Sequence, residues 1–182
     1  MNILLAIVII IIALIALLLI AALFAKKSYT VTREINIRRP RQAVFNYIRF
    51  IRNQDNYNKW SMADPNAVKT YSGTDGQVGF IYAWDSNVKN VGKGAQEIKG
   101  ITEEERIDLE LRFEKPFKGV AVAQVSTTEI AADQTRIRWS FSSSMKYPMN
   151  IMLLLLNLEG VLGRDLEGSL ANLKNVLEQN NE

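Results

Sequence analysis

The first hydrophobic pattern along the chain is unbroken. Residues 3–24 read ILLAIVIIIIALIALLLIAALF and contain no charged or strongly polar side chain. A helix of this length rises about 33 Å at ~1.5 Å per residue, which is enough to cross a hydrocarbon core of about 30 Å. Because such a helix would be apolar on every face, the pattern predicts a transmembrane anchor over residues 3–25.

A cleaved signal peptide is the alternative interpretation of this segment. Three features argue against it: no basic residue precedes the run, the run exceeds the usual ~7–15 residues, and Leu23-Phe24-Ala25 is its nearest approach to a cleavage site. Lys26 and Lys27 follow the run, and basic residues beside a span favour the cytoplasmic side. We therefore expect a single-pass membrane protein whose C-terminal domain is cytoplasmic.

After Lys27 the pattern changes to period two, which is typical of strands. Tyr29, Val31, Ile35 and Ile37 share one side of a strand over residues 29–37, and Arg33 interrupts that side. Helical spacing follows over residues 40–52, and then comes a polar, turn-like stretch around Trp60. The next alternating segments predict an antiparallel series of strands over residues 78–84, 95–102, 106–113, 120–130 and 136–142.

The chain returns to helical spacing near its end. A leucine stripe predicts an amphipathic helix, with charged residues on the other faces; its members are Leu158, Leu162, Leu166, Leu170, Leu173 and Leu177. The segment before it, residues 151–156, is apolar all round but far too short to span a bilayer. We interpret it as a buried first turn, or as a lip that faces ligand or membrane.

Charge is distributed unevenly along the chain. The net charge is +3, but residues 26–60 contain nine basic and two acidic side chains, which leaves −4 for the rest. Basic residues beside an anchor either hold the domain against anionic head groups or only set the topology, and both interpretations stay open. Nucleic-acid binding is not expected, because no binding motif accompanies the charge.

The chain offers little for catalysis. It contains no His and no Cys, which excludes imidazole and thiol catalysis and the usual nitrogen and sulfur metal ligands. Neither a dinucleotide fingerprint nor a phosphate-binding loop is present, and Glu103–Glu105 is interpreted as a solvated hairpin end. Tyr82, Gln124 and Asp165 are the polar residues expected nearest a pocket, and they form no catalytic set. We expect no catalytic residue, no metal site and no cofactor.

The order of these elements resembles the SRPBCC (START-like) superfamily, in its polyketide cyclase/dehydrase and lipid-transport branch. The resemblance covers nearly all of residues 28–178 and rests on these segments: Ile35-Asn36-Ile37 with Pro40 and Val44-Phe45, Lys59-Trp60-Ser61, Val78-Gly79-Phe80 to Trp84, Thr135 to Trp139, Gly163 to Glu167, and Leu170 to Lys174. It implies an α+β helix-grip fold, in which a curved antiparallel sheet surrounds a long C-terminal helix. The N-terminal transmembrane helix lies outside this pattern.

The resemblance also implies an apolar cavity between the sheet and the C-terminal helix. The candidate ligand-binding residues are Trp60, Phe80, Tyr82, Trp84, Leu111, Phe113, Trp139 and Phe141. The leading hypothesis is a membrane-anchored protein that binds a lipid or another apolar small molecule, with the lipid bilayer as its second partner. A cyclase/dehydrase-type enzyme and a protein-interaction or regulatory domain with a filled core are the alternatives.

Overall fold

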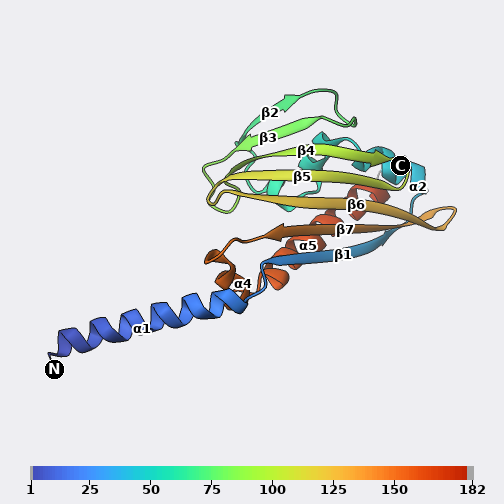
Figure 1. Ribbon diagram of the computed structural model, residues 1–182. Coiled ribbons are helices and arrows are strands. Elements are labelled where there is room, and N and C mark those ends of the chain that lie inside the picture. The colour runs from blue at the N-terminus through green and yellow to red at the C-terminus, as the bar shows by residue number, and fades with distance from the viewer. Residues whose placement is uncertain (1, 180–182) are drawn as a thin grey trace.

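Seven antiparallel strands form one sheet that curves around a long C-terminal helix (Figure 1). The computed structural model describes residues 2–179. Its elements are α1 (Ile3–Phe24), β1 (Ser28–Ile37), α2 (Arg41–Ile48), η1 (Ile51–Asn56), α3 (Lys59–Met62), β2 (Val68–Ser72), β3 (Ile81–Asp85), β4 (Lys93–Thr102), β5 (Arg106–Lys115), β6 (Gly119–Ala131), β7 (Gln134–Ser144), η2 (Met149–Ile151), α4 (Met152–Leu155) and α5 (Leu158–Gln179). The strand order is β1-β7-β6-β5-β4-β3-β2, so only β1 joins the sheet out of sequence. The predicted helix-grip fold is confirmed.

The core lies between the inner face of the sheet and the leucine stripe of α5. Leu166, Leu170 and Leu173 are at most 1% exposed, and they belong to one cluster with inward residues of the strands, such as Ile98 and Ile137. Burying side chains of this size contributes about 1.5–3 kcal/mol each before the entropic costs of folding. The leucine stripe of α5 and the inward residues of the strands are therefore buried against each other, which fixes the position of the helix on the sheet.

Arg33, which interrupts the apolar side of β1, has a structural role. Its guanidinium crosses α5 at Gly163, where an added Cβ would lie 2.1 Å from Nη2. Its Nε donates to Oε1 of Glu167 at 2.5 Å, and its Nη1 donates to the carbonyl of Thr32. The missing side chain at Gly163 thus lets a cation on the sheet reach the polar flank of the helix.

The sheet has two distinct ends, and the anchor lies at one of them. At this end β1 begins and β7 ends, with Ser28 paired to Ser144. The β3–β4 and β5–β6 connections lie at the same end. Segment 145–157 and the first turn of α5 follow at the same end (Figure 1). We call it the anchor end.

The anchor helix is fastened to the domain by one buried side chain. Nδ2 of Asn150, in η2, donates to the carbonyls of Ala22 at 2.6 Å and of Ala25 at 3.2 Å. The last carbonyls of a helix have no partner within the helix, so Asn150 caps the C-terminal end of α1. Residue 150 is fully buried although most of its neighbours in the chain are exposed.

The local structure differs from the sequence-based expectations in several places, and it decides between the two interpretations of segment 151–156. The predicted strand 78–84 begins only at Ile81, and Val78 is exposed outside it. The strand β2 pairs with β3 and was not predicted, and the stretch around Trp60 contains the short helix α3. Segment 151–156 is no buried first turn, because Leu154, Leu155 and Leu156 are all exposed.

Gly94 provides a test of how tightly the inner face is packed. A Cβ there would lie 2.6 Å from the carbonyl oxygen of Arg112 and 2.8 Å from the ring of Trp84, so both neighbours must move. We expect Gly94→Ala to lower the free energy of unfolding by roughly 1–3 kcal/mol, measured by chemical denaturation of the full chain. Gly119→Ala is the control, since nothing lies within 4 Å of its added Cβ. Equal stability of the two variants would contradict this packing.

Candidate functional site

A cavity of about 250 Å³ remains between the sheet, α3 and the first half of α5. Its apolar and aromatic wall consists of Trp60, Ala67, Tyr82, Trp84, Val91, Leu111, Phe113, Pro116, Ala123, Trp139, Phe141, Leu162 and Leu166. Its polar residues are Gln54, Asn58, Ser61, Asp64, Lys69, Asn90, Gln96 and Lys115. The cavity is therefore mainly apolar, with polar groups concentrated in the segment 54–69.

Seven of the eight candidate residues named from the sequence line this cavity. They come from β3, β5 and β7 of the curved sheet and from α3, which covers the cavity from outside the sheet. Phe80 is the exception: it is 1% exposed and stacks on Tyr71 with 6.2 Å between ring centroids, so it belongs to the core. All three tryptophans of the chain lie in the wall.

Successive ring contacts link part of the aromatic wall to Tyr71 behind it. Tyr71 stacks on Tyr82 at 5.5 Å, Tyr82 meets Trp84 at 5.7 Å, and Trp84 meets Phe113 edge-on at 6.1 Å. Nε1 of Trp84 donates to the carbonyl of Val91 at 3.2 Å, which fixes the indole at the edge of the cavity. These contacts restrict the orientation of the rings, so this part of the wall keeps its shape without a ligand.

The polar side of the cavity was not predicted from the sequence. Nδ2 of Asn58 donates to Gln54, and Lys69 pairs with Asp55 at 2.8 Å. In the wall, Nε2 of Gln96 and Nε1 of Trp139 have no acceptor within residues 2–179. An unpaired buried donor costs about 1–3 kcal/mol, so a ligand with an oxygen atom within reach of either group would gain a hydrogen bond. One residue in the sequence could have indicated the short helix on this side of the cavity: Asn58, a favourable helix N-cap residue two positions before Trp60.

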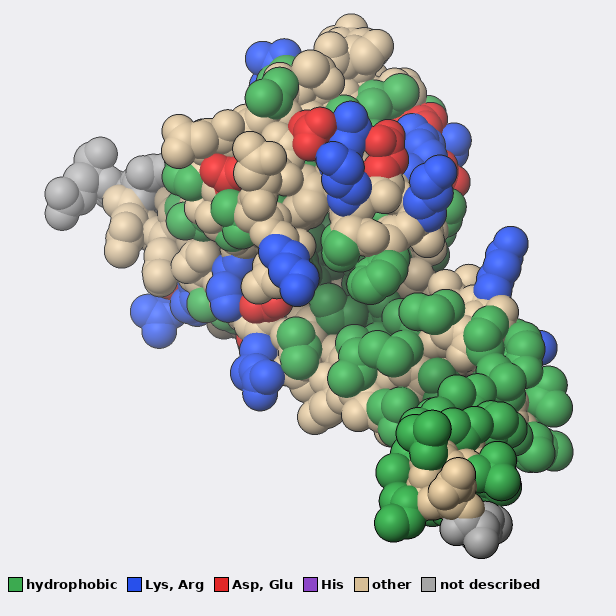
Figure 2. Space-filling model, turned by 90° about the vertical axis from the view of Figure 1, so that its left-hand side faces the viewer, with side chains coloured by type: hydrophobic (Ala, Val, Ile, Leu, Met, Phe, Trp, Pro, Cys, Tyr) green, Lys and Arg blue, Asp and Glu red, His purple; other side chains and the backbone are tan. Residues whose placement is uncertain are grey.

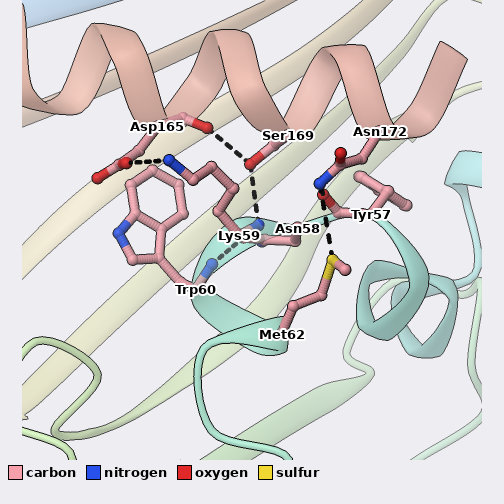
Figure 3. A network of polar contacts seen from close by, with 8 residues as sticks. All are labelled: Tyr57, Asn58, Lys59, Trp60, Met62, Asp165, Ser169 and Asn172. Carbon is pink, nitrogen blue, oxygen red and sulfur yellow. Dashed lines mark hydrogen bonds and ion pairs between the residues drawn. The ribbon is translucent and has the colours of Figure 1, made fainter. Parts of the chain in front are cut away.

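The short helix α3 is held on α5 by a polar network, which places Trp60 (Figure 3). The backbone N–H of Lys59 donates to Oγ of Ser169 at 3.0 Å, and Nζ of Lys59 pairs with Asp165 at 2.9 Å. Lys59 crosses α5 at Gly168, where a Cβ would lie 2.5 Å from its Cδ. Asn172 adds a bond to the carbonyl of Tyr57. This network closes one side of the cavity.

Of the three polar residues expected near a pocket, only Tyr82 lines it. Asp165 pairs with Lys59 in the network that holds α3, and Gln124 donates to Asp108 on the outer face of the sheet. Burial raises the pKa of Tyr82 to about 12. The nearby Asp55 raises this pKa further, and a hydrogen bond with Ser61 partly offsets the increase. The Tyr82 hydroxyl is thus a neutral hydrogen-bonding group at physiological pH. Within residues 2–179, no three acidic side chains are grouped as metal ligands.

The cavity lies toward the anchor end of the sheet. The cavity is lined at this end by Asn90 and Val91 of the β3–β4 connection, by Lys115 at the end of β5 with Pro116 after it, and by Leu162 in the first turns of α5. Figure 2, which looks onto this end, shows a hollow with apolar walls next to the apolar surface of α1. The opening and the anchor are therefore on the same side of the domain.

The comparisons agree with this architecture. The chain superposes on a solution structure from Thermobifida fusca with a TM-score of 0.63 and 13% identity, covering 84% of this chain and 95% of the other. The chain therefore has the helix-grip fold. Norcoclaurine synthase from Thalictrum flavum, solved with dopamine and hydroxybenzaldehyde, superposes with a TM-score of 0.61 and 10% identity, covering 85% of this chain and 89% of the other. The Aha1 dimer of Colwellia psychrerythraea superposes with a TM-score of 0.58 and 13% identity, covering 85% of this chain and 99% of the other.

The sequence matches no protein-family model and no curated protein. At 10–13% identity, the solved structures show the helix-grip fold and nothing about a specific ligand.

The raised pKa of Tyr82 predicts a pH dependence of stability. An unfolded tyrosine loses its proton near pH 10, whereas folded Tyr82 keeps it to about pH 12. Over this interval the folded state binds more protons, so the free energy of unfolding falls as the pH rises. We expect Tyr82→Phe to make this fall smaller, measured by urea unfolding of the full chain in detergent between pH 8 and 11.5. Identical pH profiles for the variant and the unchanged chain would contradict the burial of this hydroxyl.

Proposed function

We propose that this chain is a membrane-anchored protein that binds an apolar small molecule, such as a lipid, in the cavity between its sheet and α5. The observation that supports ligand binding is the cavity itself. A filled core would leave no such volume, and here the strongest hydrophobes of β3, β5 and β7 face a hollow of about 250 Å³. The protein-interaction alternative assumed a filled core, and it therefore has less support.

The anchor supports a membrane location. α1 has a mean hydropathy of 3.8 over its most apolar window, and among residues 2–179 it is the helix long and apolar enough to cross a bilayer. Most of its side chains are exposed, in contrast with a core helix of a soluble protein, so they lack an apolar environment unless lipid supplies one. The lysines that follow α1 favour a cytoplasmic position for the domain.

The proposed ligand is mainly apolar and carries a small number of oxygen atoms. The aromatic wall offers flat surfaces for a ring or an acyl chain, and the unpaired donors of Gln96 and Trp139 suit a hydroxyl, carbonyl or carboxylate oxygen. The neighbour norcoclaurine synthase was solved with two small aromatic molecules, which shows that such molecules are compatible with the fold. No arrangement of side chains in the cavity favours a particular reaction.

Dibromostearic acid tests this proposal in the full chain. Bromine quenches tryptophan at contact, and all three tryptophans of the chain are in the cavity wall, with none in α1. We expect the probe to quench the emission of the chain in lipid nanodiscs. Ala123→Leu extends a side chain into the cavity. The apparent affinity for the probe, measured by quenching, should fall roughly tenfold, which corresponds to ~1.4 kcal/mol.

The matched control is Val122→Leu, the neighbouring position on the outer face of β6, which is 55% exposed. This variant should bind the probe like the unchanged chain. Circular dichroism establishes that both variants are folded. If the probe fails to quench the unchanged chain, or if Ala123→Leu and Val122→Leu are quenched equally, the cavity is not the binding site. Mass spectrometry of a solvent extract of the purified chain would then show whether another apolar molecule copurifies.

A further inference from the structure

The anchor end of the domain carries a second apolar surface besides α1. Exposed apolar side chains lie at the anchor end, as the cavity does: Phe24 at the end of α1, Phe117 in the β5–β6 connection, Tyr147, Met149, Leu154, Leu155 and Leu156 between β7 and α5, and Val161 in α5. Phe117 is 74% exposed and Leu155 62%. Single exposed hydrophobes are common, but a contiguous group indicates an interaction surface. We call these eight residues the apolar rim.

The position of the apolar rim relative to α1 is set by Asn150. Because this side chain binds the carbonyls of Ala22 and Ala25, η2 lies beside the last turn of α1, and α4 follows η2 directly. Lys26 and Lys27 follow immediately and mark where the chain leaves the apolar phase. The rim is therefore held at the depth at which α1 would meet the lipid head groups. Figure 2 shows this apolar surface continuing from α1 toward the hollow under the sheet.

The charges around the apolar rim are mainly positive. Lys26, Lys27, Lys115, Lys118 and Lys146 all lie at the anchor end and are exposed, and none of them forms an ion pair within the described residues. Glu114 at this end is engaged by Lys93, and Glu159 is the only acidic residue of segment 145–162. Apolar side chains flanked by free lysines match an anionic leaflet, in which acyl chains lie below negatively charged head groups.

From this arrangement we propose that the apolar rim docks on the anionic leaflet from which α1 emerges, so that the cavity opens directly into the lipid. The inference rests on the proposed membrane anchoring and names the partner of the same site. Lys115 and Pro116 line the cavity while Phe117, the next residue, belongs to the rim. A molecule in the leaflet would thus pass from acyl chains to the aromatic wall without crossing water.

Fluorescent labels on the full chain test this docking. The chain contains no cysteine, so Phe117→Cys and Leu155→Cys each give one site for an environment-sensitive nitrobenzoxadiazole label. The matched control is Val78→Cys, which is 61% exposed in the connection between β2 and β3, at the opposite end of the sheet. In nanodiscs that contain anionic lipid and a doxyl-labelled lipid, labels at 117 and 155 should be strongly quenched and the label at 78 should not.

The lipid charge provides a second readout. In nanodiscs of phosphatidylcholine alone, quenching at 117 should fall, because the lysines no longer meet anionic head groups, while α1 keeps the chain in the disc. Quenching at 117 and 155 that is no stronger than at 78 would overturn the docking. An unquenched but blue-shifted label at 155 would also overturn it and assign the surface to a protein partner.

The docking and the proposed function can fail separately. A chain whose labels are quenched by lipid but whose tryptophans are not quenched by dibromostearic acid docks on the membrane without using the cavity. The reverse result keeps the cavity and overturns the docking. A chain that does not enter nanodiscs at all overturns the anchor and the docking together.

Discussion

The packing of α5 against the concave face of the sheet is the contact on which the rest of the structure depends. This packing is uneven along the helix. Leu170, Leu173 and Leu177 are buried in the core, whereas Leu162 and Leu166 border the cavity. Arg33 and Lys59 lie across α5 at Gly163 and Gly168 and tie the intervening turns to β1 and α3. The helix is thus held along most of its length, and the cavity remains beside Leu162 and Leu166 in its first half.

The polar contacts around α5 explain why the cavity does not collapse. A hollow lined by apolar groups is unfavourable unless its walls are fixed by other interactions. Here the ring contacts fix one wall, and the bonds from Lys59 and Asn172 fix α3 on the other side. The stability of the cavity is therefore supplied by residues around it, most of which a ligand would not touch.

Much of this fold could be predicted from the sequence, because its strands alternate cleanly and its last helix has a clear stripe. The same alternation, together with the family resemblance, pointed to six of the aromatic or apolar residues in the cavity wall; the seventh, Trp60, lies in a segment without alternation. The alternation failed for Phe80, because a side chain that faces inward can be covered by a neighbouring strand, and β2 with Tyr71 was not recognised. The polar side of the cavity was missed because segment 54–69 has no periodic pattern. Asn150 was missed as well, since its partners are backbone carbonyls 125 or more positions away.

The connection between α1 and β1 limits how far the domain can travel. Only residues 25–27 separate the two elements, and three extended residues span about 10 Å. With α1 in a bilayer, the domain would stay within roughly this distance of the surface and could not carry cargo to a second membrane. A molecule taken up by the cavity would have to be released into the same membrane, or passed to a carrier that comes to it.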